Sequence, residues 1–107
     1  MMNFNEYQKL ARSTAVYPVQ DKIVYPALGL CGEAGEVADK IKKTIRGDST
    51  LEQVTGSIAD ELGDVLWYLA ILADDLGVEL EDVAQWNIYK LNRRWRKGNI
   101  KGDGDNR

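Results

Sequence analysis

The hydrophobic and polar positions along the chain predict helices from one end to the other. Apolar residues recur at the spacing of a helix face, and no run alternates at the two-residue period of a strand. The first predicted helix begins after Asn5, with Gln8 as the partner in a capping box. Its inner face is expected to carry Tyr7, Leu10, Ala11 and Thr14.

A second and a third helix follow a loop that holds both prolines. Pro26 suits the first turn of the second helix, which should run to about Arg46 and stop at Gly47. The third helix should begin somewhere between Thr50 and Ser57 and end near Gly77. Its stretch 65–73 is apolar on every side, which predicts burial all round, in the protomer or in an oligomer interface.

The fourth predicted helix spans about residues 79–97 and ends at Gly98. Its first turn is acidic and its end is basic, which matches the helix macrodipole. Its core face is expected to consist of Leu80, Ala84, Ile88, Leu91 and Trp95. The polar, glycine-rich tail from about residue 98 to residue 107 should be a loop or a disordered end.

Four helices in 107 residues predict one all-α domain over residues 1–107, arranged as a four-helix bundle. A protomer of this size often leaves an apolar helix face uncovered. We therefore expect a homo-oligomer, with a self-sufficient monomer as the alternative.

Composition and charge narrow the possible partners. The net charge of -3 disfavours a general nucleic-acid binder, but it allows a small anionic substrate held by a few local cations. The single cysteine, Cys31, permits no intrachain disulfide. The start of the chain lacks an apolar signal core, and its longest apolar run is far shorter than the ~20 residues that span a bilayer. We expect a cytoplasmic protein with no membrane partner and no nucleic-acid partner.

Two pairs of carboxylates stand out as candidate chemistry. The stretch "GLCGEAGEVADK" carries Glu33 and Glu36, and "ELGD" carries Glu61 and Asp64 at the same spacing. On a helical wheel the first pair lies at the boundary between core and solvent. The second pair comes one turn before the apolar stretch 65–73, so we expect it to enter the interior.

Antiparallel packing of the second and third helices would bring all four carboxylates together. Their repulsion would raise their pKa values, and a hard divalent cation would relieve it. Mg²⁺, with Mn²⁺ as the other choice, prefers such an all-oxygen site. A single E-x-x-E motif is usually a solvated helix face, but a second pair that leads into a buried helix favours the metal site.

The absence of histidine excludes several other sites. A di-iron bundle needs E-x-x-H, structural zinc needs cysteine or histidine, and Ser-His or Cys-His catalysis needs a histidine. The chain also lacks the G-x-x-x-x-G-K-[ST] loop of the P-loop nucleotidases.

The fourth helix offers cations that complement the carboxylates. Asn87, Lys90 and Arg94 form a stripe beside its core face, which suits the phosphates of a metal-bound polyphosphate. Lys40, beside Glu33 on the second helix, joins the expected substrate-binding residues. Alternatively, Lys90 and Arg94 are solvated or paired with acidic neighbours. A nucleobase could stack on an aromatic ring, although aromatic residues at helical spacing are more often core; the candidates are Trp67, Tyr68 and Trp86.

The run "GLCGEAGEVADKIKK" followed by "ELGDVLWYLA" resembles the MazG-like, all-α nucleotide pyrophosphohydrolases, and the resemblance extends from about Tyr7 to Arg94. It implies hydrolysis of a nucleoside triphosphate between its α and β phosphates, which yields the monophosphate and pyrophosphate. It also implies a homodimer or homotetramer that cleans the nucleotide pool. The Mg²⁺ ligands that it implies are Glu33, Glu36, Glu61 and Asp64.

The resemblance leaves the general base and the substrate open. Some family members carry two adjacent glutamates at the start of the motif, whereas Gly32 precedes Glu33 here. Glu33 and Glu36 are therefore the candidate catalytic bases. Two alternatives remain, namely a relative that acts on dUTP or phosphoribosyl-ATP, and a non-catalytic helical module whose carboxylates pair with the cations of a partner.

Overall fold

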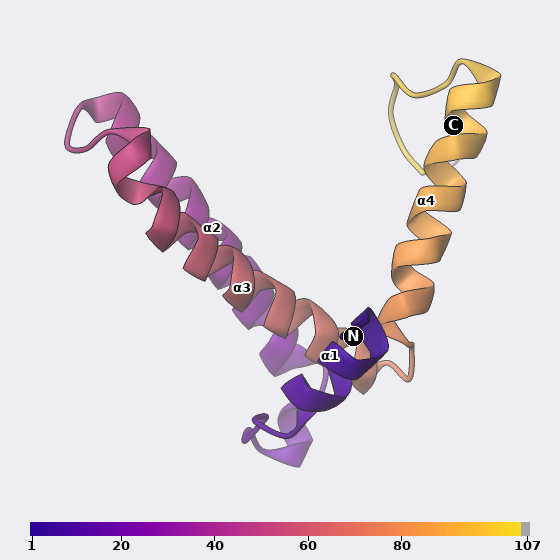
Figure 1. Cartoon of the computed structure of the whole chain (residues 1–107). Coiled ribbons are helices and arrows are strands. Elements are labelled where there is room, and N and C mark those ends of the chain that lie inside the picture. The colour runs from indigo at the N-terminus through magenta and orange to yellow at the C-terminus, as the bar shows by residue number, and fades with distance from the viewer. Residues whose placement is uncertain (106–107) are drawn as a thin grey trace.

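The computed structural model describes residues 1–105, which form four α-helices and one short 3₁₀ turn (Figure 1). In chain order these are α1 (Phe4–Arg12), η1 (Val19–Asp21), α2 (Val24–Arg46), α3 (Leu51–Asp75) and α4 (Leu80–Lys97). Residues 1–105 contain no strand, so the all-α prediction is confirmed for them. Asn106 and Arg107, the end of the expected polar tail, lie outside the described residues. Within the described part, no helix combines the length and apolarity needed to cross a membrane.

Local signals set most of the helix ends where the sequence predicts them. Pro26 lies in the first turn of α2, and Gly47 ends that helix in the left-handed conformation, with φ 92°. Thr50 caps α3 through a capping box with Gln53, inside the predicted range for its start. Gly98, with φ 71°, ends α4 in the same way as Gly47 ends α2.

The predicted start of the first helix is wrong. The side chain of Asn3, not Asn5, caps α1 by accepting a hydrogen bond from the N–H of Glu6. Of the predicted inner face, Ala11 is buried, whereas Leu10 and Thr14 are exposed. The helix ends at Arg12, before Thr14, so the fourth position of that face lies beyond it.

Gln8, predicted as a capping partner, is instead a buried side chain that joins three segments. Its Nε2 donates to the backbone oxygens of Ala70 and Val78, at 3.1 Å and 3.0 Å. Its Oε1 accepts from the backbone N–H of Leu80 at 3.1 Å. Because a buried amide is costly unless its donors and acceptors are satisfied, these bonds fix α1 across the α3–α4 connection.

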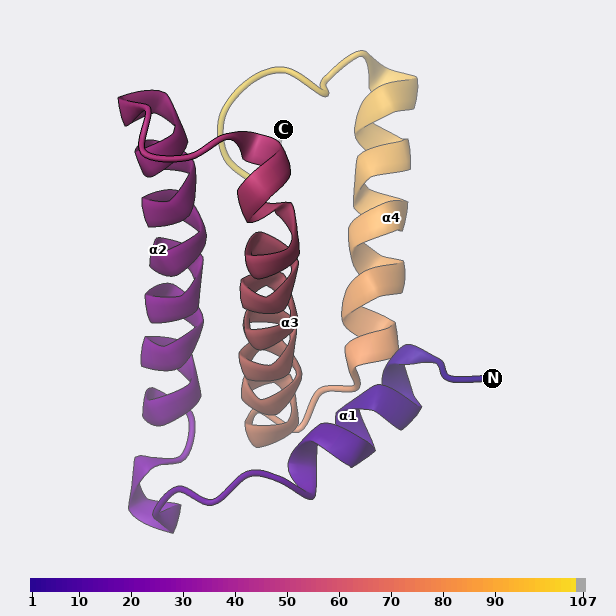
Figure 2. The same ribbon diagram turned by 60° about the vertical axis from the view of Figure 1, so that its left-hand side comes forward.

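The core lies where α1 crosses the last turns of α3. Its buried members come from α1, α3 and the first residue of α4, and they are Ala11, Ala70, Ile71 and Leu80. Helices α2 and α3 run antiparallel and side by side away from this core, as both views show (Figures 1 and 2). The rest of the apolar stretch of α3, residues 65–69, is only partly buried, so the predicted burial all round is not reached within one chain.

An anchored loop leads into α2. The carboxylate of Asp75, at the end of α3, accepts hydrogen bonds from Arg12 at 2.6 Å, from the Tyr17 hydroxyl at 2.5 Å and from the N–H of Ile23 at 2.9 Å. Ile23 has a φ of 72°, a left-handed conformation that a β-branched residue rarely adopts. The hydrogen bond to Asp75 holds this backbone in place at the entrance to α2.

Helix α4 diverges from the α2–α3 pair, so that the chain forms a V (Figure 1). The radius of gyration is 16.6 Å, compared with about 13 Å for a compact domain of this length. Of the predicted core face of α4, Leu80 is buried, but Ile88 is 58% exposed and Trp95 is 75% exposed. The described residues of one chain therefore do not close a four-helix bundle.

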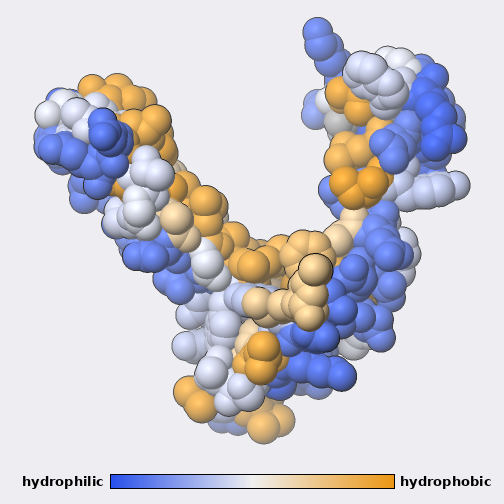
Figure 3. Space-filling model, viewed as in Figure 1, coloured by the Kyte–Doolittle hydropathy of each residue, from blue (hydrophilic) through white to orange (hydrophobic). Residues whose placement is uncertain are grey.

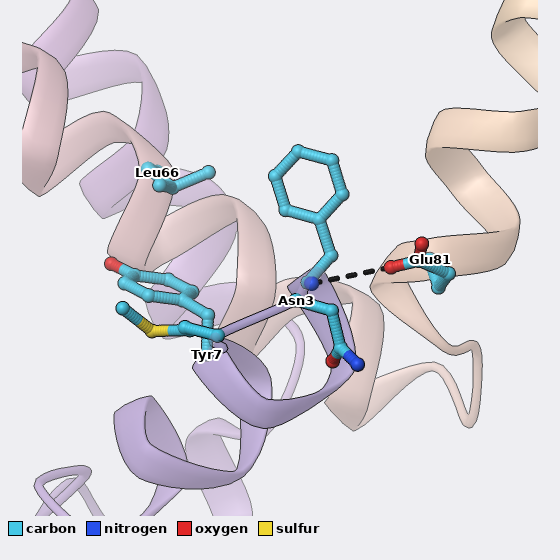
Figure 4. A pocket seen from close by; sticks show the side chains of 6 residues that line it. Asn3, Tyr7, Leu66 and Glu81 are labelled. Atoms are coloured by element: carbon cyan, nitrogen blue, oxygen red, sulfur yellow. Dashed lines mark hydrogen bonds between the residues drawn. The ribbon is translucent and has the colours of Figure 1, made fainter.

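Apolar side chains gather on the inner walls of the V (Figure 3). A pocket of about 420 Å³ lies at its base, between the start of α1, α3 and the start of α4 (Figure 4). Tyr7 and Leu66 line this pocket, and the N–H of Phe4 donates to Glu81 across it at 3.2 Å.

Candidate metal and substrate site

Antiparallel packing of α2 and α3 brings together three of the four predicted carboxylates. Glu33 of α2 and Glu61 and Asp64 of α3 each offer a carboxylate oxygen, and these oxygens lie within 4.8 Å of one another. Glu33 and Glu61 are half-buried. Asp64 is exposed, so the prediction that this pair enters the interior is wrong for Asp64. In the following text, the carboxylate cluster means these three residues.

The acidic neighbours of Glu33 favour its protonated form. A hydrogen bond with Glu61, together with burial and the charges of its acidic neighbours, raises the pKa of Glu33 to about 6. A carboxyl group is a donor only when it is protonated, so the bond to Glu61 favours the neutral form of Glu33. The cluster therefore attracts a proton or a cation more strongly than an isolated glutamate does.

Lys40 contributes a counter-charge at the edge of the cluster. Its Nζ lies 3.8 Å from Oε1 of Glu61, and both side chains are about a quarter exposed or less. No other ion pair with the cluster occurs within residues 1–105. One lysine at this distance leaves the three carboxylates with an excess of negative charge, which suits a divalent cation.

Glu36 stands apart from the cluster. It lies one turn along α2 from Glu33, it is exposed, and it is not among the three residues whose oxygens meet. Its charge still contributes to the raised pKa of Glu33. The structure thus gives Glu36 a place at the rim of the cluster.

The structure does not bring the predicted residues of α4 to the carboxylate cluster within one chain, because α4 forms the other arm of the V (Figure 1). Asn87 is exposed, Lys90 is half-buried and Arg94 is buried. Lys90 and Arg94 both pair with Asp105, each at 3.2 Å, so the sequence alternative of pairing with an acidic neighbour is realised.

Two tyrosines lie near the cluster, although the sequence predicted Tyr7 only as part of a helix face and Tyr68 only as core or as a stacking candidate. Burial and the charge of Asp64 raise the pKa of Tyr7, from α1. Burial, the neighbouring Tyr25 and the charges of Glu33 and Asp64 raise the pKa of Tyr68. Tyr68 follows Asp64 by one helical turn, a signal that the sequence carried. Tyr7 lies far away in the sequence, and no local pattern marks it.

The aromatic residues beside the cluster have structural partners. A Cβ placed on Gly29 would lie only 2.2 Å from the nearest atom of the Tyr68 ring. The ring therefore packs directly against the backbone of α2. Trp67 meets Tyr68 edge-on at a centroid distance of 5.0 Å and donates its Nε1–H to Thr14 at 2.9 Å. Trp86 is largely exposed and lines a pocket of about 280 Å³ with Asn87 and Lys90.

Comparison with known proteins identifies the family of the chain. Residues 26–98 match the family described as the MazG nucleotide pyrophosphohydrolase domain. The carboxylate cluster, Glu36, Lys40 and the stripe on α4 all lie within the matched range.

Two curated proteins are similar to the chain. The chain is 43% identical over 114 residues to the Gene 37 protein of Mycobacterium phage L5, and this alignment covers 99% of the chain and 100% of that protein. The chain is also 36% identical over 73 residues to the uncharacterized protein YvdC of Bacillus subtilis strain 168, and this alignment covers 62% of the chain and 69% of YvdC. No solved structure matches the chain significantly. The match over residues 26–98 shows that the chain belongs to the MazG nucleotide pyrophosphohydrolase family.

Proposed function

We propose that the protein hydrolyses nucleoside triphosphates, ribo or deoxy, to the monophosphate and pyrophosphate with Mg²⁺ or Mn²⁺ as its cofactor. The observation that carries the proposal is the carboxylate cluster, whose oxygens lie within 4.8 Å of one another inside the matched family domain. We propose a role in cleaning the nucleotide pool, which would place the protein in the cytoplasm.

The donor set fits a hard divalent cation. Glu33, Glu61 and Asp64 would hold it, because carboxylate oxygens are the ligands that Mg²⁺ and Mn²⁺ prefer. The raised pKa of Glu33 supports this assignment, because neighbouring negative charges disfavour its ionised form and a bound cation would relieve that repulsion. When bound, the cation supplies Lewis acidity toward the phosphate oxygens and toward water.

The chain's own side chains would position the substrate and accept the proton. Glu36 is the better candidate for the general base, because a carboxylate that stands outside the cluster is free to take a proton from the attacking water. Lys40, at the rim of the cluster, would contact the phosphates. Displacement at phosphorus depends mainly on positioning and charge neutralisation, so these roles require no protein nucleophile.

We propose that a second copy of the chain completes the site, as a homodimer or within a homotetramer. The apolar inner walls of the V and the exposed apolar residues Ile88, Leu91 and Trp95 of α4 support this, because a monomer would leave them in water. Closing the V with a second copy would also supply cations to the carboxylates from the partner's α4. Asn87, Lys90 and Arg94 would then bind phosphates across the interface.

A substrate panel tests the reaction. The protein is incubated with each NTP and dNTP, dUTP included, and with phosphoribosyl-ATP, plus Mg²⁺, and the products are separated by ion-exchange chromatography. The proposal expects monophosphate and pyrophosphate, with turnover abolished by EDTA. Diphosphate and orthophosphate as products would contradict the cleavage site. No turnover and no thermal stabilisation by millimolar Mg²⁺ would favour the non-catalytic module.

A further inference from the structure

The two cations on α4 already have an anionic partner within the chain. Lys90 and Arg94 lie one helical turn apart, and Oδ1 of Asp105 lies 3.2 Å from Lys90 Nζ and 3.2 Å from Arg94 Nη2. Arg94 Nη2 also donates to the backbone oxygen of Asp105 at 2.9 Å and to that of Gly104 at 3.5 Å. Two backbone oxygens and one carboxylate oxygen thus converge on Nη2 of Arg94, and the carboxylate pairs with both cations.

The chain reaches this position by turning back on itself after α4. We call residues 98–105 the return segment. Three of its glycines have positive φ angles, Gly98 at 71°, Gly102 at 131° and Gly104 at 80°, which residues with a Cβ rarely adopt. The N–H of Asn99 also donates to the backbone oxygen of Arg94 at 2.7 Å. The reversal is therefore encoded by the glycines of the sequence.

The return segment buries Arg94. This side chain is 4% exposed, although its helix stands apart from α2 and α3 as the second arm of the V (Figures 1 and 2). Its Nε is buried and has no hydrogen-bond partner. Leaving a charged donor unsatisfied is unfavourable, so the segment covers Arg94 without meeting all of its hydrogen-bonding capacity.

The contact with Asp105 is suited to exchange. The Asp105 side chain is 83% exposed, so water competes with Lys90 and Arg94 for its carboxylate and weakens these ion pairs. The two cations hold the pKa of Asp105 below its usual range, so the group is an anion at neutral pH. A phosphate group carries more negative charge and can pair with both donor edges of a guanidinium.

We propose that the return segment is an internal competitor for phosphate, with Asp105 occupying the anion site formed by Lys90 and Arg94. A phosphate or pyrophosphate group displaces Asp105, and the segment then releases Arg94. The inference rests on the proposed function in that Lys90 and Arg94 are the residues meant to bind substrate phosphates. The new element is the competition itself: because Asp105 must first leave Lys90 and Arg94, the apparent affinity for substrate is weaker than it would be without the return segment.

Binding of inorganic pyrophosphate tests the competition without relying on turnover. Its dissociation constant is measured by isothermal titration calorimetry at matched ionic strength, without metal, for the parent, Asp105→Asn and Asp103→Asn. Asp103 is the matched control, since it lies in the same segment, carries the same charge and makes no ion pair within residues 1–105. We expect Asp105→Asn to bind about threefold to tenfold more tightly than the parent, and Asp103→Asn to bind like the parent.

Limited digestion with trypsin provides the second readout, because Lys101 lies inside the return segment. Pyrophosphate should accelerate cleavage after Lys101 in the parent, and Asp105→Asn should be cleaved rapidly without it. Equal affinities for the two aspartate variants, no pyrophosphate binding to any of them, or an unchanged cleavage rate would each overturn the inference. If the competition is observed while the substrate panel yields no monophosphate, the proposed function fails and the internal competitor stands.

Discussion

Glu33 carries the electrostatic conflict of the candidate site. Its neighbours on α3 are close enough to hydrogen-bond with it and to raise its pKa to about 6. The nearest cation, Lys40, is 3.8 Å from Glu61 and pairs with that residue. Removing one negative charge from the cluster should therefore stabilise the metal-free protein. It should also weaken metal binding and lower turnover.

Asp64→Asn tests this directly. The substitution keeps the size of the side chain and removes one charge, so the metal-free protein should be at least as stable as the parent. Metal affinity should weaken and turnover should fall by at least ~10²-fold, because Asp64 would be a ligand. Melting temperatures with and without Mg²⁺, together with turnover rates, measure both effects.

Asp60→Asn is the matched control, since Asp60 is an exposed aspartate of α3 outside the carboxylate cluster. It should keep the metal-induced rise in melting temperature that the parent shows. A less stable metal-free Asp64→Asn protein that retains the full metal-induced rise would contradict the site.

Gly29 sets the spacing of α2 and α3 beside the cluster. In Gly29→Ala the new methyl group would stand 2.2 Å from the Tyr68 ring, so the ring or the helix must move. We expect a loss of about 1–3 kcal/mol in the free energy of unfolding, as overpacking typically causes. Urea denaturation measures it.

Gly32→Ala serves as the control in the same helix, because nothing lies within 4 Å of its added Cβ. It should leave stability unchanged or raise it by up to about 1 kcal/mol through helix propensity. Equal losses in both variants would show that the contact with Tyr68 is not the cause.

At the residue scale, the sequence predicted which carboxylates come together better than it predicted how deeply each one is buried. The spacing of Glu33, Glu61 and Asp64 was sufficient to predict their meeting, because helical periodicity fixes the face of each residue. It could not predict that Asp64 would be exposed or that Glu36 would stand outside. Those outcomes depend on the tilt of α2 against α3, which the ring of Tyr68 on Gly29 helps to set.

At the scale of the elements, helix boundaries were predictable wherever a local signal defines them. Gly47, Gly98 and the Thr50–Gln53 capping box act within a few residues of the helix ends. The role of Gln8 was not predictable, because its partners at Ala70, Val78 and Leu80 are more than sixty residues away. The same holds for the anchored loop before α2, whose partners come from α1 and α3.

The anchored loop gives a prediction that depends on pH. Burial alone would raise the pKa of Asp75, but hydrogen bonds from Ile23, Tyr17 and Arg12 outweigh it and hold this pKa below the ordinary 3.8. A lowered pKa in the folded state means that the carboxylate stabilises the fold above the unfolded pKa. This contribution is lost as the pH falls through the folded value.

Asp75→Asn should therefore reduce the free energy of unfolding by about 1–3 kcal/mol at neutral pH, because three donors lose a buried, charged acceptor. The difference between parent and variant should shrink as the pH falls below 3.8, which urea denaturation at several pH values would show. Asp74→Asn is the control, since Asp74 also pairs with Arg12 but its side chain is 43% exposed. A difference that does not change with pH would refute the role of the Asp75 charge.

At the scale of the whole molecule, the open V determines what the protein requires from its surroundings. The divergence of α4 was not predictable, because helical periodicity shows which face is apolar but not which surface covers it. On α4 the exposed apolar residues Ile88, Leu91 and Trp95 share one face, on the other side of the helix from Trp86. If a second copy fills the V, a charged substitution on this face should dissociate the oligomer, and one on the opposite face should not.

Ile88 and Trp86 allow a controlled comparison, since they are almost equally exposed in the single chain, at 58% and 60%. Ile88→Asp would place a charge in the proposed interface, where its desolvation is unfavourable, so the oligomer should dissociate. Trp86→Asp should leave the assembly intact, because Trp86 lies on the opposite side of α4 from Ile88. Sedimentation velocity across a range of concentrations measures the mass of each variant. A parent that sediments as a monomer, or two variants that dissociate alike, would refute the assembly through this face, and the cations of α4 would then have no route to the carboxylates of a second copy.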